Sequence, residues 1–513
     1  MGTTPTFAPG EGPPGASTDA AGAAGAAGAA GAAGAAGAAG APIGTGANAA
    51  APALVGLRHN LRRRHMQMIA LGGVIGAGLF VGSGVVVKAT GPAAVISFTI
   101  TGALVVLVMR MLGEMAVAYP AVGGFYEYNR LALGALAGFL TGWMYWYFWL
   151  MVVAMEAVAG AGLLNFWFPH VAPWVLTLGL ILVFTLLNLL SVRSWGEAEY
   201  WFASIKVAAI TVFLCIGVAV IIGGWPGASG GLGNLTAHGG FMPHGFIPVL
   251  TGAVAATGFY FGAELVTVAA AESAEPEQAV ARAVHSVISR VLVFYIGSIF
   301  IVVTLLPWND PGMAQPYVSA LRVLHVRGAT HIMNAVILTA VLSALNSGLY
   351  GSSRMLMALA QRGDAPRALA RLSSRGVPVF GILTGTVFGY LAVVMSYVSP
   401  KGVFAFLVNS YGTVAIFVYL LIGLAQLRLR ARLEREDPAR LRMRMWCYPY
   451  LTIVAIVGML AILAAMGLIA DQRVPLIFGI LSALAMMGGY LLRRRYGAPA
   501  GTAAGAPSAT AVR

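Results

Sequence analysis

The chain has 513 residues, of which 59% are hydrophobic and only 9% are Asp, Glu, Lys or Arg. Soluble domains use about a quarter of their residues for charge, so this composition excludes an ordinary water-exposed surface. The net charge of +14 does not indicate nucleic acid as a partner, because the basic residues lie at the ends of apolar runs and not on one solvated face or arm.

The two ends of the chain have low-complexity sequence. Residues 1–56 are nearly all Ala, Gly, Pro, Ser and Thr, with GAA repeats from Gly22 to Gly40. Nothing in this segment is large enough to bury, so we predict disordered tails at residues 1–56 and 497–513. No basic flank followed by a short apolar core precedes residue 60, so we expect no cleavable signal peptide, and the first apolar run directs insertion.

Between the tails, apolar runs of about the length needed to cross a bilayer alternate with short charged segments. The sequence therefore predicts an all-α polytopic membrane protein, with one 12-helix domain at residues 57–496. Residues 67–223 and 245–427 form two five-helix halves, and residues 448–492 hold helices 11 and 12. We place the twelve spans at about residues 67–88, 92–117, 134–165, 171–191, 197–223, 245–270, 284–307, 329–360, 378–398, 403–427, 448–470 and 475–492.

The basic residues indicate an orientation. If the N-terminus lies in the cytoplasm, 25 of the 31 Lys and Arg residues fall on that side. The opposite side receives only Lys88, Arg322, Arg327, Lys401 and Arg473. Because cytoplasmic loops carry the excess of Lys and Arg, we predict a bacterial inner-membrane protein with both termini in the cytoplasm.

Glycines interrupt the first predicted span. Gly72, Gly73, Gly76 and Gly78 lie within one short stretch, and each costs a helix interior about 0.5 to 1 kcal/mol relative to alanine. Such a run favours local unwinding; close helix packing through small residues four apart is the alternative. A dinucleotide-binding loop is disfavoured, because no βαβ unit surrounds the glycines.

The sixth span, which opens the second half, carries a matching interruption. It contains Gly252, Gly258 and then Phe261-Gly262-Ala263-Glu264 within an apolar run. Glycine-interrupted helices in matching positions of two halves indicate a transporter site, because unwinding frees backbone groups at mid-bilayer. Freed N–H groups suit a carboxylate and freed carbonyls suit an ammonium, so a zwitterion fits such a site. The candidate substrate-binding residues are Gly73, Ile75, Gly76, Ala77, Gly78, Phe259, Phe261, Gly262, Ala263 and Glu264.

Three charged side chains, Glu156, Lys206 and Glu264, fall well inside predicted spans. Each costs at least about 2.5 to 3.5 kcal/mol at the bilayer centre, so each should face the bundle interior and be partnered. Lys206 lies about 15 Å of helix beyond Gly196, too deep to reach the interface easily. Its amine is a candidate for proton coupling; a fixed ammonium bonded to carbonyls of the broken first helix is the alternative.

The sequence also predicts roles for the carboxylates at depth and near the helix ends. Glu264 braces the unwound loop or takes a proton, with a protonated carboxyl bonded to backbone as the alternative. Glu156 is expected to make interhelical hydrogen bonds, and Glu114 to act as a gate or loop anchor. The aromatic cluster from Trp143 to Trp149 is expected mostly to pack between helices.

The sequence suggests no metal and no cofactor. His65, His170 and His285 have no partner at metal-ligand spacing, and two cysteines are too few for a disulfide framework or a zinc set. A membrane-embedded enzyme would need a catalytic constellation at depth, and none is visible, so we expect no enzyme. A channel would need a repeated pore element or a ring of like charges from several subunits. This chain already carries a complete two-half bundle, so we do not expect a channel. A sensor or an exchanger on the same scaffold stays open, and the sequence does not indicate an oligomeric state.

Several motifs, in order along residues 57–495, resemble the amino acid permeases of the amino acid-polyamine-organocation superfamily. They are Arg64 to Gly73 leading to Gly76-Ala77-Gly78-Leu79-Phe80, then Gly91-Pro92, Leu112 to Met115, Gly196 to Ala203 with Ile205-Lys206-Val207, and Asn346 to Tyr350.

The resemblance implies a five-plus-five inverted repeat of the LeuT-like kind, proton-coupled symport, and substrate held between the first and sixth helices. It also implies that Lys206 takes the place of a sodium ion near the first and eighth helices, where Ser343 and Ser347 are candidate partners. Family members commonly have Thr where Ala77 stands, so a hydroxyl contact is not implied there.

A finer resemblance concerns the substrate. Gly262 to Ser273 and Arg362-Gly363-Asp364-Ala365-Pro366 are similar to the γ-aminobutyrate permease branch. The expected partners are therefore a small amino acid, protons and the lipid bilayer. Neutral, aromatic or basic α-amino acids remain alternative substrates.

Overall fold

A computed structural model of the chain describes residues 75–119, 124–190, 192–225, 231–264, 291–326, 328–374, 376–398 and 403–496. Within these residues the structure is helical throughout and contains no strand. All the helices belong to the compact unit formed by residues 51–513. In chain order they are η1 (Gly78–Gly82), α2 (Ser83–Thr90), η2 (Gly91–Ala93), α3 (Ala94–Ala118), α4 (Phe125–Leu133), α5 (Ala135–Leu164), α6 (Pro173–Leu190), α7 (Val192–Ile221), η3 (Leu232–Leu235), α8 (Phe246–Tyr260), η5 (Val291–Gly297), α11 (Ser298–Leu305), η6 (Pro311–Ala314), α12 (Pro316–Val323), α13 (Ala329–Gln361), η7 (Arg367–Ala370), α14 (Val379–Gly385), α15 (Val387–Val398), α16 (Val403–Glu436), η8 (Pro438–Arg440), α17 (Tyr450–Leu468) and α18 (Ala470–Tyr496).

In the described part of the chain, nine helical stretches are long and apolar enough to cross a membrane. One of them, Gly78–Ala118, covers parts of the first and second predicted spans. It turns at Gly91, whose φ of +70° suits a residue without a side chain. Two shorter apolar helices, Phe246–Tyr260 and Val293–Leu305, lie where the sixth and seventh spans are predicted. Over the residues it describes, the structure thus confirms an all-helical architecture with many apolar spans.

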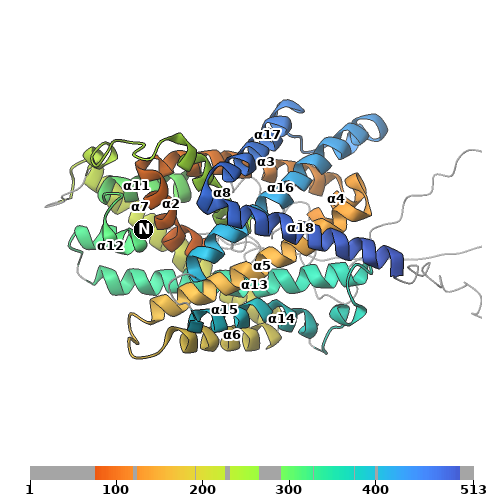
Figure 1. Ribbon diagram of the computed structural model, residues 1–513, viewed down its shortest axis with the longest axis horizontal. Helices are drawn as coiled ribbons and strands as arrows, with labels where there is room; N and C mark the ends of the chain where they lie inside the picture. Colours follow the sequence, from red (N-terminus) through yellow and green to blue (C-terminus); the bar gives the residue numbers. More distant parts are fainter. Residues whose placement is uncertain are drawn as a thin grey trace, which may run out of the picture. The chain divides into compact units, whose positions relative to one another are not determined.

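Burial separates inner helices from outer ones. The most apolar windows of α5, α16 and α13 are 78%, 72% and 67% buried, whereas that of α18 is 11% buried. The inner helices α5 and α13 lie side by side (Figure 1). Since apolar side chains on the outer helices have no protein to cover them, their exposed faces suit contact with lipid.

Two groups of helices pack against this interior. On one side α6, α14 and α15 contact α5 and one another (Figure 1). On the other side α3, α8, α16 and α17 form a second set of mutual contacts. Helix α8 contacts α16, and Phe261 in the turn after α8 lies against α5, with its ring centroid 4.1 Å from that of Phe148.

Close packing of α5 on α13 depends on small residues. A Cβ added at Gly348 of α13 would lie 2.8 Å from Val153 and 3.2 Å from Trp149 of α5. A Cβ at Gly142 of α5 would lie 2.7 Å from Leu359 of α13. Within a membrane, where apolar burial gives little driving force, such close approach increases van der Waals contact between helices.

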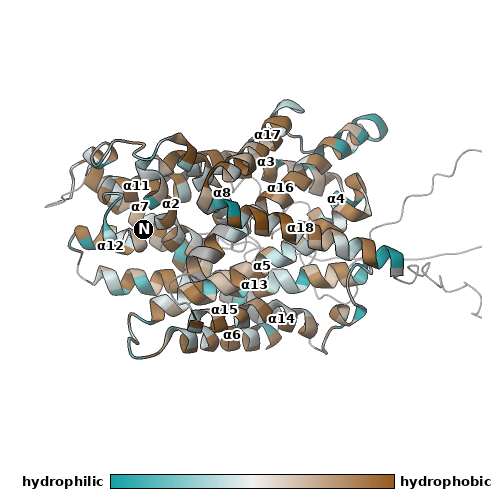
Figure 2. Ribbon diagram, in the orientation of Figure 1, coloured by the Kyte–Doolittle hydropathy of each residue, from teal (hydrophilic) through white to brown (hydrophobic). Residues whose placement is uncertain are grey.

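The helix of the tenth predicted span is longer than the span itself. The helix α16 continues to Glu436, beyond the predicted end of the apolar span near residue 427. Its last turns carry ion pairs four residues apart, Arg430–Glu434 at 2.8 Å and Arg432–Glu436 at 2.7 Å. Such pairs stabilise a polar helix outside an apolar environment, and Figure 2 shows the hydrophilic colouring of this extension. Hydropathy alone misses it.

The contact between α8 and α16 leads to a stability prediction. A Cβ added at Gly412 of α16 would lie 2.3 Å from the Val254 carbonyl oxygen of α8. Gly412→Ala should therefore separate the two helices and destabilise the protein by about 1 to 3 kcal/mol, seen as a lower unfolding temperature in detergent. Gly467→Ala is the matched control, because its Cβ would meet nothing within 4 Å. A stabilising Gly412→Ala would contradict this account of the contact.

Candidate functional site

The structure agrees with the predicted interruption of the sixth span. Helix α8 ends at Tyr260, and Phe261 is extended, with φ −66° and ψ 140°. Gly262 has φ +118°, a conformation that L side chains rarely adopt. The chain therefore leaves the helix at Phe261-Gly262, and the rest of the predicted span lies outside the described residues.

The first span begins, in the described residues, with two residues outside regular helix. Ile75 and Gly76 precede the helical turn that leads into η1, and Gly73 lies outside the described residues. The Ile75 carbonyl accepts a hydrogen bond from Lys206 Nζ at 3.0 Å. The Ala77 N–H donates to both oxygens of Glu156, each at 3.1 Å. Charged side chains thus bond backbone groups that no helix satisfies.

Lys206 of α7 is fully buried. Besides Ile75, its ammonium donates to Ser343 Oγ of α13 at 2.8 Å. The structure therefore brings together three of the regions singled out in the sequence: the start of the first span, the fifth span and the eighth span. A buried ammonium with these partners is compatible with both the coupling role and the purely structural role considered above.

Glu199 adds a carboxylate to this cluster. Its Oε1 lies 3.9 Å from Lys206 Nζ and accepts a hydrogen bond from Ser343 Oγ at 2.6 Å. Both side chains of this ion pair are fully buried. The Ser343 hydroxyl thus accepts from the lysine and donates to the glutamate, so it bridges the two charges.

The remaining polar residues near this cluster come from α13 and α6. Asn188 Nδ2 donates to Asn346 Oδ1 at 2.9 Å. Ser347, the other predicted partner of Lys206, is buried, and its hydroxyl has no hydrogen-bond partner in the described part of the chain. The structure brings Ser343, and not Ser347, to the Lys206 amine.

Glu264 lies in the turn after α8. Its two carboxylate oxygens accept from the Gly262 N–H at 2.9 and 3.0 Å, and the Tyr419 hydroxyl of α16 lies 3.4 Å away. Its side chain is fully buried. This geometry matches a carboxylate that braces the unwound turn. Ala263 beside it is buried as well.

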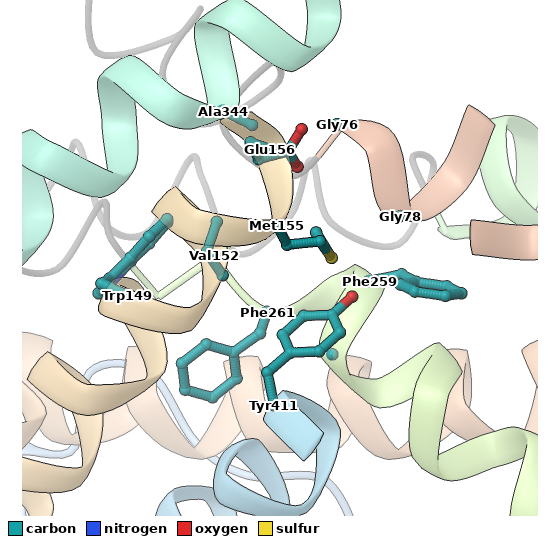
Figure 3. Close-up of a pocket in the computed structure, with 11 residues that line it drawn as sticks. Gly76, Gly78, Trp149, Val152, Met155, Glu156, Phe259, Phe261, Ala344 and Tyr411 are labelled. Carbon is teal, nitrogen blue, oxygen red and sulfur yellow. The ribbon is translucent and has the colours of Figure 1, made fainter. Parts of the chain in front are cut away.

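A small cavity lies between the first span, α5 and the end of α8 (Figure 3). Its volume is about 20 Å³, roughly the space of one water molecule, so an amino acid can enter only if side chains move. Among its lining residues, Glu156 contributes a carboxyl group. The lining consists of Gly76, Gly78, Trp149, Val152, Met155, Glu156, Gly258, Phe259, Phe261, Ala344 and Tyr411.

The cavity glycines allow close approach of the backbone. A Cβ at Gly76 would lie 2.5 Å from Glu156 Oε1, and a Cβ at Gly78 would lie 2.5 Å from the Phe259 ring. Of the predicted substrate residues, Gly76, Gly78, Phe259 and Phe261 line the cavity. Ile75, Ala77, Gly262, Ala263 and Glu264 are buried beside it but do not line it.

Two buried donors line the cavity without a hydrogen-bond partner among the described residues. They are the Tyr411 hydroxyl of α16 and the Trp149 indole N–H of α5. Figure 3 shows the Tyr411 hydroxyl directed toward Phe259 and Met155. Because an unsatisfied buried donor costs about 1 to 3 kcal/mol, these groups suit a polar ligand or water.

Glu114 lies away from the cavity in a separate buried cluster. It accepts from Arg430 Nη1 at 2.5 Å, Gln426 Nε2 at 2.7 Å and the Met445 backbone N–H at 2.5 Å. It therefore ties α3 to α16 and to the segment before α17. This geometry matches the anchor considered in the sequence and includes no contact with the cavity lining.

A second polar cluster surrounds Asp364, just after α13. The carboxylate accepts from the Tyr126 hydroxyl at 2.5 Å, from Arg130 Nη1 at 3.0 Å and from Arg493 Nη1. Trp143 donates to the Asp364 carbonyl at 3.2 Å. Burial raises the pKa of the Tyr126 hydroxyl well above its ordinary value, so the phenol stays protonated and can donate. These bonds join α4, α5, α13 and α18.

Three residues of the site escaped the sequence analysis. Glu199 had a usable signal, because it precedes Lys206 by seven residues and so shares a helix face with it. Trp149 was grouped with an aromatic cluster expected mostly to pack, yet it lines the cavity. Tyr411 lies in an apolar run with no local signal, and only the contact of α16 with α8 places it.

Comparison with known proteins adds to this geometry. The family model of amino acid permeases matches residues 65–494. The chain belongs to the amino acid permease family. The resemblance to this family in the amino acid-polyamine-organocation superfamily is thereby confirmed. The chain is a multi-pass membrane transport protein and not an enzyme.

Individual relatives are similar over most of their length. The chain is 48% identical to a γ-aminobutyric acid permease of Bacillus subtilis strain 168, over 86% of this chain and 94% of that protein. It is 45% identical to a γ-aminobutyric acid permease of Escherichia coli K12, over 77% and 85%. It is also 40% identical to an aromatic amino acid transport protein of Corynebacterium glutamicum, over 84% and 95%.

Proposed function

We propose that this permease is a proton-coupled symporter that imports γ-aminobutyrate or a related amino acid across the bacterial inner membrane by alternating access. The observation that carries the proposal is the Lys206 ammonium, bonded at once to Ile75, at the start of the described part of the first span, and to Ser343 of α13. A proton lost from Lys206 removes the charge that joins these elements. The relatives named as γ-aminobutyric acid permeases support the substrate.

The proposed architecture has twelve membrane helices in a LeuT-like five-plus-five repeat, with both termini in the cytoplasm. Residues 57–496 form the permease domain, with halves at 67–223 and 245–427. In support of the repeat, the spans that open the two halves both have backbone outside regular helix, at Ile75-Gly76 and at Phe261-Gly262. The Glu114 and Asp364 clusters then lie at the cytoplasmic end, where they tie helices together.

The proposed substrate-binding site is the cavity between the first span and the end of α8. The ammonium of the substrate pairs with the carboxyl group of Glu156, which lines the cavity. The carboxylate of the substrate accepts hydrogen bonds from Tyr411 and Trp149, whose buried donors have no partner in the described residues. Gly76 and Gly78 of the first span and Gly258, Phe259 and Phe261 at the end of α8 form walls of this cavity.

Tyr411→Phe tests this arrangement with the loss of one oxygen atom. A hydrogen bond to a charged group contributes about 1.5 to 3 kcal/mol, so the KM for uptake should rise about tenfold or more. Tyr390→Phe is the control, since Tyr390 is exposed on α15. A KM unchanged by Tyr411→Phe would show that Tyr411 does not bind the substrate.

The substrate is tested by counterflow. Proteoliposomes loaded with unlabelled γ-aminobutyrate receive a trace of labelled γ-aminobutyrate, phenylalanine, alanine or lysine outside. We expect γ-aminobutyrate to exchange fastest. Faster exchange of phenylalanine would favour an aromatic amino acid permease, the second candidate, which the 40% identical relative and the aromatic residues of the cavity support.

A further inference from the structure

The Ser343 hydroxyl lies between two ionisable groups that cannot bond each other directly. Lys206 Nζ and Glu199 Oε1 are 3.9 Å apart, beyond the range of a hydrogen bond. Ser343 Oγ is 2.8 Å from the lysine and 2.6 Å from the glutamate, within range of both. The three groups therefore form one hydrogen-bonded chain from amine to carboxylate.

We propose that Glu199 is a second proton-binding site, which receives a proton from Lys206 through the Ser343 hydroxyl. This inference rests on the proposed proton-coupled function. In the transfer, a Lys206 Nζ–H bond breaks and the proton bonds to Ser343 Oγ. At the same time the Ser343 Oγ–H bond breaks and its proton bonds to Glu199 Oε1. One proton moves, and an ammonium and a carboxylate become an amine and a carboxylic acid.

The position of Glu199 gives the transfer a direction. It precedes Lys206 by seven residues on α7, about 10 Å along the helix axis. The N-terminal end of α7 faces the cytoplasm in the proposed orientation, so the proton moves toward the side where an importer releases it. Because both groups become neutral, the buried pair is less costly to separate when the helices rearrange.

Among the described residues, one further ionisable group interacts with the Lys206–Ser343–Glu199 relay. Glu156 of α5 interacts electrostatically with Lys206 and bonds Ala77. Toward Glu199, α13 presents Ser343, Asn346 and Ser347, which do not titrate. Asn188 of α6 bonds Asn346. Lys206 thus has two carboxylate neighbours, but the hydroxyl bridge leads to Glu199 and not to Glu156.

Glu199→Gln separates proton binding from structure, because the amide can still accept from Ser343 but does not bind a proton. Three quantities are measured in proteoliposomes: counterflow of γ-aminobutyrate at equal pH, accumulation driven by an acidic exterior, and proton entry reported by a trapped pH dye. We expect counterflow within about threefold of wild type and at least a tenfold loss of driven accumulation and of proton entry. Ser343→Ala should behave alike, and Glu199→Asp should recover part of the loss.

Glu436→Gln is the matched control, since Glu436 is exposed and pairs with Arg432 at the end of α16. Glu199→Gln with wild-type accumulation and proton entry would overturn the proposal. An equal loss of counterflow and accumulation would also overturn it, because the residue would then be structural. If wild type itself accumulates nothing under the gradient, the proposed function fails instead.

Discussion

Lys206→Ala is expected to abolish proton-driven accumulation of γ-aminobutyrate, with a loss of at least about 100-fold against background. The substitution removes the ammonium that bonds both Ile75 and Ser343, so protonation no longer controls the contact between the first span and α13. Insertion should be unimpaired, because a lysine at the helix centre disfavours insertion and alanine does not.

The measurement is uptake of labelled substrate into proteoliposomes with and without an acidic exterior, alongside the yield of folded protein. Lys88→Ala is the control, since Lys88 is exposed at the end of α2. If Lys206→Ala accumulates substrate like wild type, the lysine has only a structural role and the coupling account is wrong.

Glu156→Gln should weaken substrate binding more than it weakens folding. Glutamine keeps an oxygen that can accept from the Ala77 N–H, so the contact between α5 and the first span survives. In the proposed site, the substitution removes the carboxyl group that pairs with the substrate ammonium, at a cost of about 1.5 to 3 kcal/mol, or about 10- to 150-fold in KM.

The comparison that isolates this effect is KM for uptake against the unfolding temperature in detergent. Glu434→Gln controls for the loss of a carboxylate, because Glu434 is half exposed and pairs with Arg430. A parallel fall in unfolding temperature with no change in KM would show that Glu156 serves packing and does not bind substrate.

The sequence alone predicts the break in the sixth span and the burial of the intramembrane charges, because both follow from the residues themselves. Gly262 has a φ of +118°, and the helix breaks where the glycine pattern predicts a break. Lys206 and Glu156 are buried and bonded, as intramembrane charges must be. Their specific partners depend on how α5, α7 and α13 pack, which no single segment encodes.

The remaining features depended on local charge pairs that hydropathy does not detect, or on contacts between distant segments. The extension of α16 to Glu436 is stabilised by ion pairs that hydropathy does not detect. Tyr411 lines the cavity, and the adjacent Gly412 lies where α16 closely approaches the backbone of α8. Glu199 lies near the start of a span, where charged residues are common, yet packing against α13 buries it completely.

The most direct test of the account is accumulation by wild-type protein in proteoliposomes, with the exterior acidified and then with the gradient collapsed by a protonophore. The account predicts that labelled γ-aminobutyrate accumulates above its external concentration, with proton entry, and that the protonophore releases it. Equilibration to the external concentration regardless of the gradient, or uptake only in exchange for internal amino acid, would contradict proton-coupled symport.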